Sequence, residues 1–188
     1  MKSIIYIAIT ALILISTGCS KLNSLANISV NIPYSQQVSV PQVAGDTAGV
    51  ALPAGGASLP FPTFPVVTNS QQYISQYNTS SSKIVSFELD SMKVQILSPS
   101  TQNFNFLDSI QIFISASNQP EVLVAYQYGA TSGQTTLTLN VTPNLDLKNY
   151  FIQDTMYFRV YSHINAVPAS GTQLNIASSF NLVANPLD

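Results

Sequence analysis

The chain of 188 residues contains one cysteine, Cys19, and one histidine, His163, so its reactive side chains are few. A lone cysteine excludes a disulfide bond within the chain. A Ser-His-Asp arrangement would need His163 as its general base, because histidine most often does this work near neutral pH. His163 ends an alternating run, on the face shared by Tyr157, Arg159 and Tyr161. We therefore interpret it as a surface side chain, and we assign no catalytic residue.

Metal ligands are equally sparse. A zinc site would lack its usual cysteine and histidine ligands, and calcium needs clustered oxygen ligands. The nearest acidic pair is Glu88 and Asp90, two positions apart on one strand, which we interpret as ordinary solvated carboxylates. The chain has no Gly-x-Ser-x-Gly elbow and no glycine loop with the Lys and Ser/Thr of a phosphate site. The sequence therefore predicts no metal, no cofactor and no enzymatic activity.

Residues for hydrolysing or binding a sugar are harder to identify from the sequence. The eight acidic residues would supply a carboxylate pair for glycoside hydrolysis, but nothing selects which pair. The chain has no tryptophan to stack on a sugar. Four tyrosines are candidates for such stacking, although packing on the sheet is the simpler interpretation: Tyr73, Tyr77, Tyr126 and Tyr128.

Charge excludes one class of partner. Six basic residues face eight acidic ones, for a formal net charge of −2 at pH 7, and Arg159 is the only arginine. Binding to nucleic acid requires a cluster of cations to neutralise phosphates, and the sequence has no such cluster. We therefore expect no nucleic-acid partner.

The first residues differ from the rest of the chain. Lys2 supplies a positive charge, and an uncharged apolar run extends from Ile4 to Ile15. A transmembrane helix needs about 20 apolar residues, so this run is short for a permanent span. A charged start followed by an apolar run of this length is typical of a secretory signal peptide.

The end of this run reads Ile15-Ser16-Thr17-Gly18-Cys19. Small residues directly before a cysteine resemble the lipobox of bacterial lipoprotein precursors, although Ser16 stands where that motif usually has an aliphatic residue. The resemblance implies that residues 1–18 are removed, that the Cys19 sulfur receives a diacylglycerol and that the new amino terminus is acylated. Two or more acyl chains anchor a protein stably, so a membrane is the expected partner.

The residues after the cysteine bear on location. Surface-exported lipoproteins of Bacteroidota typically carry acidic residues there, whereas this chain has Ser20-Lys21-Leu22-Asn23 and no acid before Asp46. In the sorting pattern of proteobacteria, Ser20 resembles the outer-membrane class. We therefore expect a lipid anchor in the cell envelope, in the outer membrane and facing the periplasm.

Alternation of apolar and polar residues with a period of two dominates the chain after residue 27 and predicts an all-β fold. The apolar residues shift from odd to even positions near Asp90 and Ser91, which indicates a bulge in this strand. Segments 69–78 and 147–152 are expected to form short helical turns. The alternating runs are 28–40, 87–96, 110–114, 122–128, 137–141, 156–160 and 174–182.

About seven strands joined by turns predict an antiparallel β-sandwich, immunoglobulin-like in architecture, with a small closed barrel as the alternative. We divide the chain into a signal peptide (1–18), a tether with a first strand (19–40), a linker or long loop (41–68) and the sandwich domain (69–188). The third segment is set apart because residues 41–65 hold five of the eleven prolines and four of the eight glycines.

Three functions remain open. The first is a lipid-anchored envelope protein with a structural, accessory or binding role, whose partner is an envelope protein or a glycan. The second is a pilus or adhesion subunit. The strand pattern resembles fimbrillin-type lipoproteins of Bacteroidota, which implies assembly by strand donation, but the arginine where that family is cleaved is missing here. The third is an envelope hydrolase whose site the sequence does not reveal. Residues 96–99 and 103–107 are also similar to Bacteroidota lipoproteins without an assigned activity.

Overall fold

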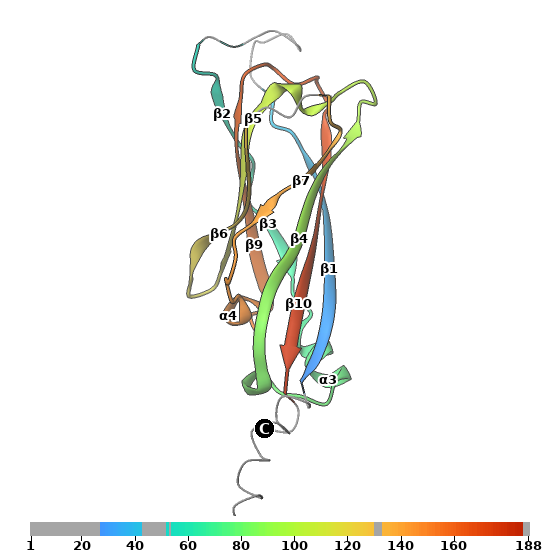
Figure 1. The fold of residues 1–188 in the computed structure, drawn as a ribbon, viewed down its shortest axis with the longest axis vertical. Coiled ribbons are helices and arrows are strands. Elements are labelled where there is room, and N and C mark those ends of the chain that lie inside the picture. Colours follow the sequence, from blue (N-terminus) through green and yellow to red (C-terminus); the bar gives the residue numbers. More distant parts are fainter. Residues whose placement is uncertain (1–26, 43–51, 53, 130–132, 186–188) are drawn as a thin grey trace, which may run out of the picture.

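The computed structural model describes residues 27–42, 52, 54–129 and 133–185 (Figure 1). The predicted signal peptide and Cys19 lie outside the described residues. Within the described part, the chain forms two antiparallel sheets that face each other along an elongated molecule. The sequence prediction of an all-β antiparallel sandwich is confirmed, and these residues do not form a closed barrel.

The first sheet, which we call the β4 sheet, has four strands in the order β1-β10-β4-β7. Residues Ile28–Ser39 form β1, an edge strand that pairs along its whole length with β10 (Gln173–Ala184). The other neighbour of β10 is β4 (Ile84–Ser98), and β4 in turn pairs with the short β7 (Thr136–Thr138). Pro33 lies in β1, where its missing N–H is tolerated because β1 is an edge strand.

The second sheet, which we call the β5 sheet, has six strands. Its centre is β9 (Thr155–Ile164) beside β5 (Leu107–Ala116), followed by β6 (Gln119–Tyr128) and β8 (Asn140–Val141). On its other edge β9 pairs with both β2 (Ala57–Pro60) and β3 (Phe64–Val67). The helical segments are α3 (Ser70–Gln76), α4 (Lys148–Phe151) and two single 3₁₀ turns at Ser81–Lys83 and Phe104–Phe106.

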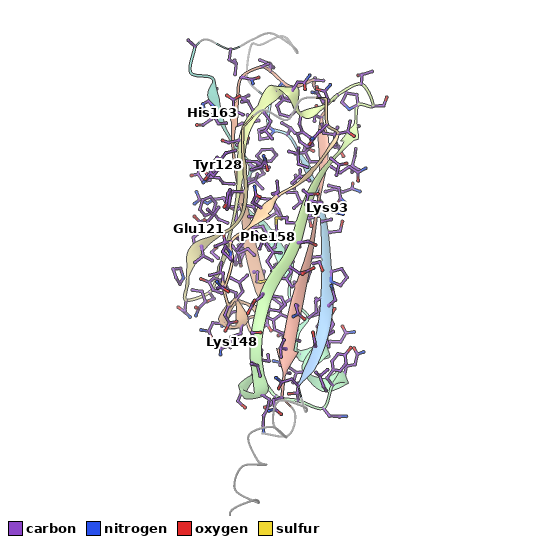
Figure 2. The ribbon with its side chains drawn as sticks, viewed as in Figure 1. Lys93, Glu121, Tyr128, Lys148, Phe158 and His163 are labelled. Carbon is purple, nitrogen blue, oxygen red and sulfur yellow. The ribbon has the colours of Figure 1, made fainter. Side chains whose placement is uncertain are left out.

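The core lies between the two sheets, where the inward residues of each alternating strand meet. The ring of Phe87 on β4 stacks on Phe180 of β10, with centroids 4.7 Å apart, and on Phe151 of α4 at 4.4 Å. Phe158 of β9 enters the same layer from the β5 sheet and is 2% exposed (Figure 2). Burial of these large rings and of the aliphatic side chains around them drives folding, and a single cysteine provides no disulfide within the chain.

Three local predictions are confirmed. Ser179 of β10 pairs with Ser91 of β4, and the next residue, Phe180, pairs with Leu89. Asp90 therefore has no partner in this register and is the extra residue of a bulge. The helical turns expected in 69–78 and 147–152 are α3 and α4.

The linker or loop predicted for 41–68 requires correction, because two strands, β2 and β3, lie within it. Both strands are four residues long, and each is at a sheet edge, where a proline does not remove a required hydrogen bond. Pro60 faces Tyr161 and Pro65 faces Tyr157 in this pairing. The sandwich therefore uses residues from Ile28 onward, not only 69–188.

The run 137–141 also differs from its prediction as one strand. It divides at Leu139, whose N–H donates to the carbonyl of Met92, so that β7 belongs to the β4 sheet and β8 to the β5 sheet. With β2 and β3, this division gives ten strands in the described residues instead of about seven.

Candidate functional site

The outer face of the β5 sheet, turned away from the core, is rich in aromatic side chains. Because alternate residues of a strand point to the same side, β9 places Tyr157, Arg159 and Tyr161 on this face, and β5 adds Gln111 and Phe113. Figure 2 shows that the labelled Glu121, Tyr128 and His163 also lie on the side of the β5 sheet away from the β4 sheet. We call this surface the tyrosine face and define it by Gln111, Phe113, Glu121, Tyr126, Tyr128, Tyr157, Arg159 and Tyr161.

Arg159 lies at the centre of the tyrosine face. Its Nε and Nη2 donate to the two carboxylate oxygens of Glu121 on β6, two strands away across the sheet. The guanidinium carbon also lies 4.3 Å from the ring centroid of Tyr161 and 5.3 Å from that of Phe113. These two rings meet edge to face, with centroids 6.0 Å apart. The bidentate ion pair and the cation–π contacts hold the guanidinium in place on this face.

A second group of rings lies on β6. Tyr126 and Tyr128 have centroids 5.2 Å apart, and the Tyr128 hydroxyl accepts a hydrogen bond of 2.7 Å from the Gln111 side chain. Among the large apolar or aromatic side chains described as exposed, Tyr128, Tyr157 and Tyr161 belong to this one face, with exposures of 55%, 42% and 39%. An exposed aromatic patch rimmed by polar groups is typical of a binding surface.

The outer face of the β4 sheet has different chemistry. Its β1 and β10 side chains form short polar pairs across the strands, in which serine hydroxyls donate to asparagine oxygens: Ser29 to Asn181, Ser35 to Asn175 and Ser179 to Asn31. Its exposed large apolar side chains, Val85 and Leu97, lie at positions of β4 that have no partner in the register with β10. Aromatic enrichment is therefore specific to the β5 sheet.

His163 lies at the end of β9 and contacts Asp108 through Nδ1, 3.3 Å from Oδ2. The other carboxylate oxygen of Asp108 accepts a hydrogen bond of 2.7 Å from Asn165. A Cβ on Gly56 would lie 2.6 Å from His163 Cε1, so this glycine packs directly on the imidazole. Ser58 and Ser109 are the neighbours of His163 in the strand register. Within the described residues, neither serine hydroxyl hydrogen-bonds the imidazole.

A cleft of about 270 Å³ opens between the edge strands β1 and β3. Phe158 and Ile176 form part of its lining, and Tyr34 lines it from β1. The Tyr34 hydroxyl donates to the carbonyl of Thr68 at 2.8 Å. Burial of the phenol, and secondarily the nearby Tyr73, raises the pKa of Tyr34 well above its ordinary value.

The remaining candidates from the sequence are dispersed. Glu88 and Asp90 are exposed on β4, and the described residues contain no group of three ligands suited to a metal ion. Tyr73 packs against Phe151 with ring centroids 6.2 Å apart, whereas Tyr126 and Tyr128 lie on the tyrosine face. Sequence reasoning placed Arg159 between two tyrosines but missed Glu121 and Phe113, because only the strand register brings them together.

None of the helices in the described ranges is both long enough and apolar enough to cross a bilayer.

Comparison with known proteins gives no family. No family model and no curated protein sequence matches the chain. Its fold is similar to a structure of infectious bursal disease virus Gt strain, at 12% identity and a TM-score of 0.32, over 85% of this chain and 33% of that one. It is also similar to Desmodium yellow mottle tymovirus, at 13% identity and a TM-score of 0.26, covering 86% of this chain and 91% of that one.

The decameric BFDV capsid protein is similar at 8% identity and a TM-score of 0.34, over 84% of this chain and 97% of that one. The chain spans about a third of the length of the bursal disease virus protein. These likenesses carry no argument about the function of this chain.

Proposed function

We propose that this protein is a lipid-anchored binding module of the cell envelope, without catalytic activity, which presents the tyrosine face to a partner. The anchor is the predicted acylated Cys19, and the proposed location is the outer membrane, facing the periplasm. The binding role rests on one observation: the only arginine of the chain and three exposed tyrosines gather on one face of one sheet.

The chemistry of this face supports binding more than catalysis. Aromatic residues and arginine are enriched at the centres of binding surfaces, because they bury a large area for few rotatable bonds. Arg159 is already fixed by Glu121 and two rings, so little side-chain entropy is lost when a partner covers it. The His163–Asp108 pair at the end of β9 has neither a hydroxyl partner nor a described cleft around it.

The proposed anchor also fits the position of the first strand. Eight residues, 20–27, separate Cys19 from Ile28, which limits the separation of these two residues to about 30 Å. Ile28 lies beside Ala184, at the end of the sandwich where β10 terminates. A chain lipidated at Cys19 would thus hold this end of the sandwich near the bilayer.

Fractionation of cells tests the anchor. Cys19→Ser should move most of the protein from the membrane fraction to the soluble fraction, because it removes the acylated sulfur, whereas Ser24→Ala should not. An unchanged membrane fraction for Cys19→Ser would refute the anchor. Activity is tested separately on envelope polysaccharides and peptides, and turnover that is abolished by His163→Ala would refute the non-enzymatic role.

The cleft between β1 and β3 favours a second candidate function, a subunit assembled by strand addition. Both of these strands lie at the border of their sheets, so an extended segment of another subunit would find free backbone groups on either side and an apolar floor beneath. Analytical ultracentrifugation at high concentration tests this function. It predicts oligomers that are lost in Val67→Glu, at the lip of the cleft, and retained in the control Val85→Glu. Monomers at every concentration would contradict it.

A further inference from the structure

We infer that the tyrosine face binds an uncharged glycan chain. This inference rests on the proposed binding role and names the class of its ligand. Three properties of the face carry it: the aromatic area, the type of hydrogen-bonding groups around it and the internal pairing of its charges.

The aromatic area offers flat surfaces along a line. Tyr157, Arg159 and Tyr161 follow one another at every second position of β9, so neighbouring members are about 7 Å apart. The guanidinium packs against the rings of Tyr161 and Phe113, which meet edge to face, and the 39% of Tyr161 that stays exposed is an aromatic surface. The C–H faces of a pyranose ring are apolar and flat, and they pack on such surfaces while the sugar hydroxyls point outward.

The polar groups around the rings match hydroxyl groups. Gln111 on β5 and Asn140, the register partner of Tyr126 on β8, carry side-chain amides, and an amide both donates and accepts hydrogen bonds, as each sugar hydroxyl does. The Gln111 amide is already oriented, because it donates a hydrogen bond to the Tyr128 hydroxyl. A glycan lying over the rings would meet oriented donors and acceptors on the β6 side.

The charges on this face are satisfied within the protein, which selects an uncharged ligand. The fork of Arg159 is occupied by both oxygens of Glu121. Asp108, at the His163 end, contacts Asn165 and His163. The lysines of the described chain lie elsewhere: Lys83 before β4, Lys93 on β4 and Lys148 in α4. An acidic polysaccharide would find no unpaired cation among the described residues of this face.

The length of the face suits a chain rather than a single sugar. The two described clefts lie elsewhere, between β1 and β3 and beside α3. A row of exposed side chains binds a ligand more tightly when several linked units of that ligand contact it together. The distance from Tyr157 to Tyr161, about 13 Å along β9, provides length for more than one sugar unit.

Binding measurements on the full mature protein in lipid nanodiscs test the inference. The probes are uncharged hexasaccharides of β-1,4-glucose, α-1,4-glucose, β-1,4-mannose and β-1,4-N-acetylglucosamine, with a hexauronate as the charged comparison. We expect at least one uncharged hexasaccharide to bind, and the hexauronate to bind at least about tenfold more weakly. Thermal unfolding of each variant establishes that it is folded.

Tyr157→Ala and Tyr161→Ala should each weaken binding by about tenfold, because each removes one stacking surface. Leu97→Ala, an exposed apolar residue on the opposite sheet, is the matched control and should bind as the wild type does. No binding of any uncharged hexasaccharide, preferred binding of the hexauronate, or unchanged binding in both tyrosine variants would overturn the inference. A protein ligand on this face would also overturn it but would leave the proposed binding role intact.

Discussion

At the scale of single residues, the arrangement around Arg159 depends on the shape of its side chain more than on its charge. The planar guanidinium binds both oxygens of Glu121 and at the same time covers Tyr161 and Phe113. A lysine would retain the charge but has neither the fork nor the flat surface. The side chain therefore organises the tyrosine face by fixing the positions of its neighbours.

A double-mutant cycle measures the interaction of Arg159 with Glu121. The side chains of both residues are about one-third exposed, so we expect a coupling free energy of at most about 1 kcal/mol in urea denaturation. Arg159→Ala alone should cost more than Glu121→Ala, because only the arginine also contacts the two rings. Equal costs would show that the cation–π contacts contribute nothing measurable.

Tyr34 makes the free energy of unfolding depend on pH in the alkaline range. Burial raises the pKa of its phenol above the ordinary value of 10.0, so the folded chain retains this proton at a pH where the unfolded chain has lost it. The contribution of the protonated Tyr34 phenol to the free energy of unfolding is complete below pH 10. It is lost as the pH rises through the pKa that Tyr34 has in the folded chain.

Tyr34→Phe should reduce the free energy of unfolding at pH 7 by about 1 kcal/mol, through loss of the bond to Thr68. Denaturation between pH 9 and 11 should then show a shallower decline for the variant than for the wild type. Parallel declines would show that Tyr34 does not cause the dependence.

At the scale of elements, alternation in the sequence was sufficient to predict the long strands and the bulge at Asp90. Such patterns report which face a residue turns to the core, and this property is local to one strand. The assignment of β7 and β8 to different sheets depends on where Leu139 meets Met92, and the pairing of β2 and β3 depends on the free edge of β9. Contacts of this kind join distant segments of the chain, and they produce no periodic pattern in the sequence.

The same limit applies to the candidate site. Tyr157, Arg159 and Tyr161 could be predicted to share a face, because they alternate on one strand. Glu121 is 38 residues from Arg159, and its contact follows from two successive strand registers. The sequence therefore predicted that the three β9 residues share a side of the sheet, but it did not predict which residues of β5 and β6 complete the tyrosine face.

Deletions in β4 test the role of the bulge. Leu89 and Met92 both point to the core although they are three positions apart, because Asp90 is the extra residue. Deleting Asp90 should restore regular alternation and cost only about 1 kcal/mol in urea denaturation.

Deleting Glu88 is the matched control, because it removes the same charge from the same strand. It should cost at least about 2 kcal/mol more than deleting Asp90, since Leu89 would then turn outward. Equal costs for the two deletions would contradict the assignment of Asp90 as the extra residue.

At the scale of the whole molecule, the two outer faces and the two ends have different chemistry. The 15 residues of β4 extend about 50 Å, and the β4 sheet carries small polar pairs while the β5 sheet carries the tyrosine face. The start of β1 and the end of β10 lie together at one end of the sandwich (Figure 1). With the proposed anchor at this end, the tyrosine face extends along the side of the molecule and is open to a partner beside the membrane.

The mass of the native amino terminus tests the central proposal most directly. Protein isolated from membranes and digested should yield an amino-terminal peptide that begins at Cys19 and carries the mass of a diacylglyceryl group, with a further acyl chain on the new amino group. A peptide that begins elsewhere, or an unmodified Cys19 in protein recovered from the membrane fraction, would contradict a lipid-anchored envelope role.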